Sequence, residues 1–324
     1  MLSDSKNRIH KLYHSEEFSK LAKAEILITG GNSFMAETLL EALNNISRSQ
    51  NFKISVQLGV RDLNRKQNNR YSHLNIHFFH YQIENVIQTS IAPSHIVHFA
   101  FSHSENSYLL KSNSNSVDKL LKSFPHNPEM KFVYASSGAV YGHKDLGSFR
   151  SNESDYSTSN HSNYSQQKVA TEEILAKLTN QGKIQGISAR LFSFYGSSLP
   201  LNRSFAICQF MNDGINGREI AINSSGESVR SYMLDSVVGL RLAQLLVSNF
   251  TGAINIGSEN AISILELGEV IAKVFEVNYR LKNEYEVSSF YVPDTSLLQN
   301  TLGFIPECNL LAEILSWKSE LTGN

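Results

Sequence analysis

The stretch ILITGGNSFMAETLL, residues 26–40, decides the fold of this chain. A strand-length apolar run comes first, Gly30 and Gly31 follow it, and a helix-length segment begins near Met35. Glycine lets the backbone turn tightly after a strand, and the free amides at a helix N-terminus bind anionic oxygens. Because parallel sheets bind pyrophosphate at such a turn, the stretch predicts a strand, a turn and a helix that together hold a diphosphate.

Segments of strand length and helix length alternate through the first half of the chain. Continuous apolar runs are typical of parallel strands buried on both faces, and right-handed helical crossovers join such strands. The expected strands span residues 24–29, 54–60, 75–79, 95–100, 131–135 and 186–192, and the expected helices begin near Met35, Ser107 and Tyr164. The pattern predicts an α/β fold with a doubly wound parallel sheet of the Rossmann type.

The same pattern divides the chain into regions. Residues 25–194 are expected to form the nucleotide-binding domain, after an N-terminal extension over residues 1–24. A Ser/Asn-rich stretch over residues 145–162 has the composition of a loop. The later strands are short and irregular, so residues 195–324 are expected to form mainly a smaller substrate-binding lobe. Segments near 235–257 are expected to return to the nucleotide-binding domain.

Composition excludes several classes of partner. The chain has 324 residues, and 29 basic side chains nearly balance 30 acidic ones, giving a formal net charge of −1. Without an excess of positive charge, neither nucleic acid nor an anionic membrane is an expected partner. Residues 1–24 carry charges throughout, and no apolar run reaches membrane-spanning length, so the sequence predicts a cytoplasmic protein.

Cysteine and histidine spacing argues against a metal site. The two cysteines, Cys208 and Cys308, are expected to be buried free thiols, with one long-range disulfide as the alternative. His95 and His98 lie three apart on an expected strand and therefore on opposite faces of the sheet. No other spacing of His or Cys is typical of metal ligands, and no metal is expected.

A series of short motifs follows the first turn. They are TGGNSFMA (29–36), HIVHFA (95–100), NSNSVDKLL (113–121), KFVYASSGAVYG (131–142), YSQQKVATE (164–172), SARLFSFYG (188–196) and VRSYML (229–234). In this order they resemble the NAD-dependent epimerase/dehydratase family, the extended short-chain dehydrogenases, from about Glu25 to Trp317. An ordered series is a stronger signal than any single match. The resemblance implies a nicotinamide dinucleotide and a nucleoside diphosphate sugar as ligands.

Tyr164 and Lys168 are the candidate catalytic pair. Four residues apart, they lie on one face of a helix, where the ammonium can lower the pKa of the phenol toward the working range. Such a phenol exchanges a proton with a sugar hydroxyl while hydride moves. Among 13 tyrosines only Tyr164 has lysine at this offset, although an ordinary surface pair remains the alternative. The resemblance adds a ribose contact for Lys168 and assigns Ser137 to the reacting oxygen, with the adjacent Ser136 as a structural serine.

The resemblance also implies binding residues. Besides Tyr164 and Lys168, the residues expected to contact the cofactor are Gly30, Ser33, Phe34, Met35, Arg61, Ala100 and Asn113. Arg230 matches the arginine that clamps the substrate diphosphate, with a surface ion pair as the alternative. Three positions depart from the family. Ser33 replaces a glycine, Gln82 stands where an acidic residue often reaches adenine, and Ser193 stands where asparagine is usual.

The expected reaction is reduction of a 4-keto sugar, and a nucleotide-sugar 4-epimerase is the first alternative. A catalytically silent nucleotide-binding scaffold is the second, and a lipid or steroid oxidoreductase is disfavoured by Arg230. Dehydratases of the family carry an Asp-Glu pair after the catalytic serine or threonine, where Gly138 and Ala139 stand here. Arg61 at the end of the second strand favours NADP, with NAD as the alternative.

A homodimer is expected through the helix that begins at Tyr164, because members of the family commonly pair through the helices that flank the active site. The apolar residues of this helix serve equally well as core residues, so the sequence leaves both roles open. They are Val169, Ile174, Leu175 and Leu178.

Overall fold

The computed structural model describes residues 4–63, 69–83, 87, 91–102, 113, 115–125, 127–155, 162–282, 287–306 and 309–322. Its centre is a parallel sheet of seven strands in the order β11-β6-β5-β4-β1-β2-β3. The strands are β1 Glu25–Thr29, β2 Ile54–Val60, β3 Leu74–His80, β4 His95–His98, β5 Lys131–Ser137, β6 Gln185–Leu191 and β11 Gly252–Ile256. The prediction of a doubly wound parallel sheet is confirmed.

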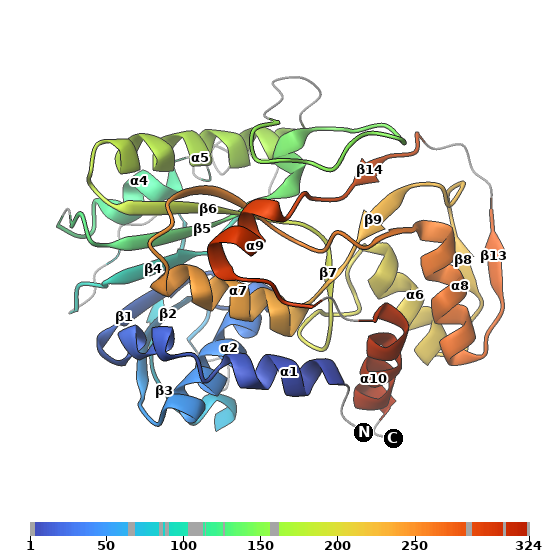
Figure 1. Ribbon diagram of the computed structural model, residues 1–324, viewed down its shortest axis with the longest axis horizontal. Helices are drawn as coiled ribbons and strands as arrows, with labels where there is room; N and C mark the ends of the chain where they lie inside the picture. The colour runs from blue at the N-terminus through green and yellow to red at the C-terminus, as the bar shows by residue number, and fades with distance from the viewer. Residues whose placement is uncertain are drawn as a thin grey trace.

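Helices cover both faces of the sheet (Figure 1). On one face lie α2 (Phe34–Gln50) and α7 (Asp235–Val247), and on the other lie α4 (Ser116–Leu121) and α5 (Asn163–Asn180). All seven residues of β5 are buried, as expected for a strand between two helical layers. Side chains that alternate along a strand enter opposite layers, so each strand joins two cores.

Local signals explain where the helices begin. The hydroxyl of Ser33 accepts the amide of Ala36 at 3.2 Å and starts α2, and Ser162 accepts the amide of Ser165 at 3.2 Å and starts α5. Residues 145–155 of the Ser/Asn-rich stretch form two isolated bridges, and residues 156–161 lie outside the described part. The helix expected near Ser107–Phe124 is represented by α4, because residues 107–112 are not among those described.

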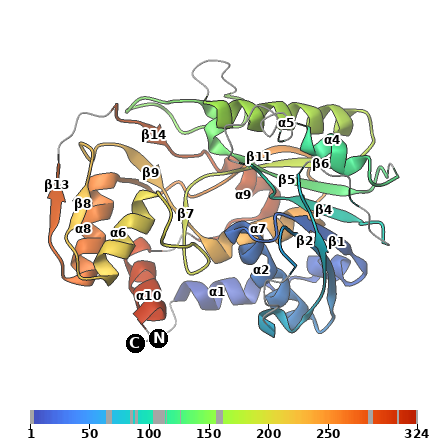
Figure 2. The same cartoon turned by 180° about the vertical axis from the view of Figure 1, so that it is seen from behind.

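The chain after β6 builds a lobe beside the carboxyl edge of the sheet (Figures 1 and 2). Short strands pair there as β10-β7, β12-β9-β14 and β13-β8. They are β7 Phe194–Tyr195, β8 Ile220–Ile222, β9 Val229–Ser231, β10 Met233–Leu234, β12 Ala261–Ser263, β13 Tyr279–Leu281 and β14 Phe290–Tyr291. The helices of this part are α6 Ala206–Ile215, α8 Ile264–Phe275, α9 Ser296–Leu302 and α10 Leu310–Thr322.

Two late elements return to the central sheet. Helix α7 packs against α2, and β11 pairs in parallel with β6 along its whole length. The lobe is therefore formed by the chain between β6 and α7 together with the chain after β11, and both connections fix its position over the strand ends.

The leading segment packs against the sheet domain. It consists of α1 (Asp4–Leu12) and a 3-10 helix, η1 (Glu16–Lys23), whose Phe18 and Leu21 are buried. Lys20 Nζ donates to the carbonyl of Val247 at 3.0 Å, at the end of α7. These contacts tie the start of the described chain to a helix that forms much later in the sequence.

Candidate active site

A cleft of about 1620 Å³ runs along the carboxyl ends of the central strands. Its floor is formed by the residues that follow β1, β2, β4 and β5, and its opposite wall by the lobe, including Arg230 and Tyr291. In open α/β sheets ligands bind at this edge, because several strand ends and helix N-termini meet there.

The turn after β1 forms one end of the cleft. Gly30 has a φ of 74°, and a Cβ at this position would lie 2.7 Å from the backbone nitrogen of Ala100. Only glycine fits, since both the positive φ and the close approach exclude a side chain. Ala100 lines the cleft beside the turn.

The first amides of α2 face this cleft. Those of Phe34 and Met35 cannot bond within the helix, and no described residue accepts from them. Asn32 Oδ1, in the same turn, is buried without a hydrogen-bond partner among the described residues. Two free amides and an unpaired acceptor fit the diphosphate and a ribose hydroxyl of a dinucleotide. Ser33 lines the cleft too, although its oxygen already accepts from Ala36.

Ser137 and Tyr164 meet at the middle of the cleft. Burial raises the pKa of Tyr164 above that of an ordinary phenol, and a side-chain hydrogen bond with Ser137 lowers it. The Ser137 oxygen also accepts the amide of Ala139 at 3.2 Å. The hydroxyl of Ser136 instead donates to Glu172. Adjacent residues of a strand point to opposite faces, so the two serines have different surroundings.

Lys168 is buried behind Tyr164. Its Nζ donates to the carbonyl of Ala135 at 2.7 Å and lies 5.6 Å from the centroid of the Tyr164 ring. Burial lowers the pKa of Lys168 to about 7, and the negative charge of Glu172 raises it. The structure therefore brings Tyr164, Lys168 and Ser137 together, on α5 and at the end of β5.

A buried ion pair holds α5 against the sheet. Arg190 Nη2 lies 2.8 Å from Oε2 of Glu172, and Arg190 Nη1 donates to the hydroxyl of Tyr141 at 2.9 Å. Both charged side chains are at most one-tenth exposed, with values of 5% and 10%. Since Glu172 also accepts from Ser136, this pair connects β5, β6 and α5.

Asn113 lies behind the cleft. Its side chain accepts the amide of Ser102 at 2.8 Å and donates to Gln167 at 2.6 Å. It is 2% exposed and is not among the residues that line the cleft. The structure therefore gives Asn113 a bracing position between the segment after β4 and α5, where the resemblance implies a contact with the cofactor.

A neutral histidine supports the same region. His98 is fully buried between the hydroxyls of Thr29, at 2.7 Å, and Ser116, at 2.8 Å. Burial lowers its pKa to about 3, so the ring is uncharged at physiological pH.

No cluster of three or more His, Cys, Asp or Glu side chains suited to a metal occurs within the described residues. Cys208 is a buried free thiol, and Cys308 lies outside them.

Tyr291 is a site residue that sequence reasoning missed. It enters the cleft from β14, and its pKa is raised by burial and lowered by a side-chain hydrogen bond with Ser137. Ser137 thus has two phenols as neighbours. A tyrosine in a short strand of the lobe carries no spacing relative to Ser137 or Tyr164, so no local signal marks it.

The binding residues expected around the rim line the cleft as well. The guanidinium of Arg230 donates to the carbonyls of Val229, at 2.8 Å, and Ser289, at 3.0 Å, and to the Ser289 hydroxyl at 2.9 Å. These acceptors are neutral, so the charge of Arg230 is available to an anion. Arg61, Gln82 and Ser193 line the same cleft.

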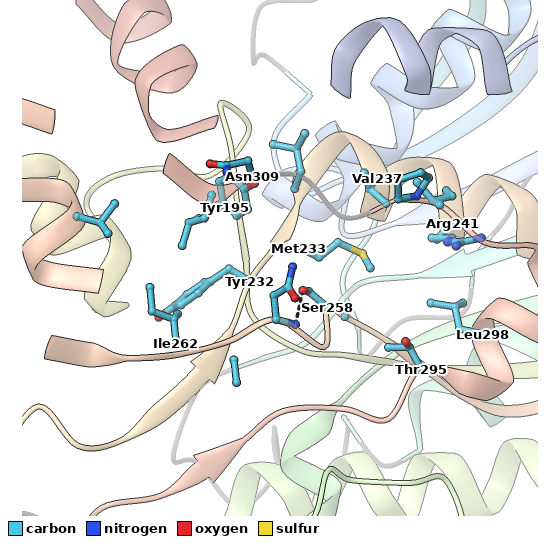
Figure 3. A pocket seen from close by; sticks show the side chains of 18 of the residues that line it. Tyr195, Tyr232, Met233, Val237, Arg241, Ser258, Ile262, Thr295, Leu298 and Asn309 are labelled. Carbon is cyan, nitrogen blue, oxygen red and sulfur yellow. Dashed lines mark hydrogen bonds between the residues drawn. The ribbon is translucent and has the colours of Figure 1, made fainter. Parts of the chain in front are cut away.

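A second cavity of about 550 Å³ lies between α7, the chain after β11 and the start of α10 (Figure 3). Arg241 in its wall is 2% exposed, and burial lowers its pKa to about 10. The guanidinium donates to the carbonyls of Leu302, at 3.2 Å, and Gly303, at 2.9 Å. A cation at a helix C-terminus satisfies free carbonyls, so these contacts explain Arg241 as the cap of α9.

A parallel sheet with a glycine turn after its first strand is typical of the dinucleotide-binding class of α/β proteins. The profile of the NAD dependent epimerase/dehydratase family matches residues 26–239, and the chain belongs to this family. The predicted resemblance is confirmed.

Relatives and structural neighbours are similar to the chain at low identity. UDP-glucuronic acid decarboxylase 3 of Arabidopsis thaliana is 26% identical over 152 residues, which are 45% of this chain and 44% of that protein. The chain thus aligns with less than half of that relative. ADP-L-glycero-D-manno-heptose-6-epimerase of Brachyspira hyodysenteriae is 23% identical over 274 residues, which are 78% of this chain and 81% of that protein.

Solved structures share the fold. UDP-glucose 4-epimerase of Thermotoga maritima with UDP-glucose has a TM-score of 0.74 at 19% identity, covering 92% of this chain and 99% of that one. The dTDP-glucose 4,6-dehydratase of Bacillus anthracis in complex with NAD has a TM-score of 0.73 at 18% identity, covering 93% of this chain and 97% of that one.

Among the described residues, no helix has the length and apolar character needed to cross a membrane.

Proposed function

We propose that this protein reduces the 4-keto group of a nucleoside diphosphate sugar with a nicotinamide dinucleotide. The observation that carries the proposal is the convergence of Tyr164, Lys168 and Ser137 in one cleft, beside a turn with free amides. Structural neighbours named for UDP-glucose and NAD support the two ligand classes. A silent scaffold has no need of a buried lysine behind a phenol.

The chain's own residues perform the proton transfer. When bound, the reduced dinucleotide supplies a hydride to C4, and the C4–O4 double bond becomes a single bond. Tyr164 gives its proton to O4, Ser137 donates a hydrogen bond to the same oxygen, and solvent later returns a proton to the phenolate. The positive charge of Lys168 stabilises that phenolate. Arg230 and the amides of Phe34 and Met35 bind the phosphate groups of substrate and cofactor, respectively.

Dehydration is disfavoured by the space at residue 138. A Cβ on Gly138 would lie 2.7 Å from the Phe192 ring and 2.7 Å from the hydroxyl of Tyr291. An aspartate at this position would therefore have to displace both aromatic side chains. Ala139 has no proton to exchange, so neither residue after Ser137 supplies the acid and base that elimination requires.

Reduction is ranked above 4-epimerisation because of Ser33. An epimerase retains its dinucleotide through oxidation and re-reduction, whereas a reductase releases it in each turnover. Ser33 stands where the family has glycine and lines the cleft at the phosphate turn, so its side chain takes up space beside the diphosphate and favours an exchanging cofactor. Epimerisation is the second candidate, since Ser137, Tyr164 and Lys168 suffice for it and several structural neighbours are named 4-epimerases.

The test supplies a 4-keto-6-deoxy sugar nucleotide with NADPH and follows loss of absorbance of the reduced cofactor. A parallel reaction supplies a hexose nucleotide without added cofactor. Inversion at C4 in the second reaction would make the protein an epimerase, and a 4-keto-6-deoxy product would refute the argument against dehydration.

We predict that NADPH binds more tightly than NADH. Arg61 follows β2 directly, is exposed and lines the cleft, so its guanidinium is available to a 2′-phosphate. A charge-assisted hydrogen bond contributes about 1.5–3 kcal/mol, or roughly ten- to hundredfold in affinity. Fluorescence titration of both cofactors measures the preference, and Arg61→Gln should remove most of it. Equal or tighter binding of NADH by the unaltered protein contradicts the prediction.

We also propose a homodimer through α5. Leu175 is 1% exposed and belongs to the core, whereas Ile174 and Leu178 pack against the same core but are only partly buried. Light scattering at micromolar concentration is expected to give twice the mass of one chain. A monomeric mass at that concentration would end the proposal.

A further inference from the structure

The surroundings of the Lys168 ammonium are aromatic. An ammonium carries three N–H donors, and the acceptor that the described residues offer it is the carbonyl of Ala135, at 2.7 Å. The Nζ atom also lies 4.4 Å from the ring centroid of Phe101 and 4.8 Å from that of Tyr134. The donors that do not bond Ala135 therefore face ring surfaces, which attract a cation but accept no conventional hydrogen bond.

The aromatic neighbours of Lys168 differ in their freedom to move. Tyr134 is 2% exposed in the middle of the sheet, and Tyr164 stands on the first turn of α5. Phe101 follows β4, is only partly buried and lines the cleft. Its ring also meets the Tyr164 ring edge-on, with centroids 5.1 Å apart and an interplanar angle of 74°. Lys168 is itself 5% exposed and lines the cleft, and Phe101 is the cleft-lining ring nearest to its ammonium.

We propose that Phe101 is a positioning residue for Tyr164 and Lys168, whose ring covers the ammonium on the cleft side and must move aside when a ligand hydroxyl bonds Lys168. The identity of that ligand as a nicotinamide dinucleotide rests on the proposed function. The position of the Phe101 ring over the Lys168 ammonium, which we call the cover, belongs to the protein without ligand.

Two effects of the ring on Lys168 oppose each other. The ring excludes water, which favours the neutral amine, and its face attracts the charged form. Burial is the dominant influence on the lowered pKa of Lys168, so admitting water should raise that pKa. A leucine in place of Phe101 keeps the exclusion of water but removes the aromatic face, and it should lower the pKa.

The experiment measures acetylation of Lys168 in the intact protein by mass spectrometry across a range of pH, with the exposed Lys53 as internal standard. The high-pH plateau of the rate reports access to the amine, and the midpoint reports its pKa. In Phe101→Ala we expect the plateau to rise at least about tenfold and the midpoint to move to higher pH. In Phe101→Leu we expect a low plateau and a midpoint below that of the unaltered protein.

Phe149→Ala is the matched control, because Phe149 is 90% exposed and does not line the cleft. This substitution should leave the high-pH plateau and the midpoint of Lys168 acetylation unchanged. If Phe101→Ala gives the plateau and midpoint of the unaltered protein, Phe101 does not cover Lys168 and the inference is wrong.

Addition of NADPH separates this inference from the proposed function. The dinucleotide should protect Lys168 from acetylation in the unaltered protein, and it should associate faster with Phe101→Ala. A raised plateau in Phe101→Ala without protection by NADPH supports the cover and refutes the cofactor assignment. If NADPH protects Lys168 but the plateau in Phe101→Ala is unchanged, the result supports the cofactor assignment and refutes the cover.

Discussion

Replacing Tyr164 by phenylalanine is expected to abolish turnover while leaving the fold and dinucleotide binding nearly unchanged. The substitution removes one hydroxyl, whose hydrogen bond with Ser137 contributes about 0.5–1.5 kcal/mol to stability. A general acid contributes roughly 10²- to 10⁴-fold to the rate. Activity is measured as turnover of a 4-keto sugar nucleotide. A thermal melt reports on the fold, and a cofactor titration reports on dinucleotide binding. Retention of more than about a tenth of the activity would remove Tyr164 from the acid/base role.

Tyr291→Phe is the matched control for this experiment, because it deletes the other phenol that bonds Ser137. Among the described residues, the cation at the Tyr291 ring is Arg230, 5.9 Å from the ring centroid and assigned to the substrate diphosphate, whereas Tyr164 lies over Lys168. We therefore expect a partial loss of turnover in this variant, through a less well-oriented Ser137. If Tyr291→Phe is the inactive variant and Tyr164→Phe is active, the two phenols have the opposite roles.

Replacing Arg190 by methionine is expected to cost about 3–5 kcal/mol of stability, because it leaves a buried carboxylate without its cation. Arg190 donates to Glu172 through Nε and Nη2 and to the hydroxyl of Tyr141, so one substitution leaves several buried groups unpaired. The free energy of unfolding from urea titration measures the loss. The double variant Arg190→Met, Glu172→Met should recover a large part of it, since removing both charges also removes the cost of burying them.

Arg280→Met is the surface control. Its ion pair with Glu219 has an N–O distance of 3.0 Å, close to that of the buried pair, but the two side chains are 60% and 46% exposed. Exposed pairs contribute about 0–1 kcal/mol. A loss in Arg190→Met no larger than in Arg280→Met would mean that solvent reaches Glu172 and that the pair does not hold α5.

The sequence predicts those features whose signals are local. The bounds expected for β2 agree with the structure, because a continuous apolar run reports burial directly. The juxtaposition of Tyr164 and Lys168 follows from helical spacing alone.

Contacts across the cleft could not be predicted in this way. Tyr291 reaches Ser137 from a strand of the lobe, and Phe101 reaches Lys168 from the segment after β4. Strand alternation predicts that Ser136 and Ser137 face opposite ways, but the position of Glu172 on α5 decides that Ser136 bonds this carboxylate and Ser137 bonds Tyr164. Asn113 is matched by motif, yet its hydrogen bonds direct it to Ser102 and Gln167 instead of the cleft.

The late return of the chain to its first sheet has a consequence for how the protein is made in cells. During synthesis β6 leaves the ribosome long before its neighbour β11, and α7 is also still absent, so the growing chain exposes an unpaired strand edge and an uncovered apolar face. Such edges and faces promote association between nascent chains. The sheet domain is therefore complete only once residues 252–256 have emerged, and until then the free edge of β6 is where we expect nascent chains to associate.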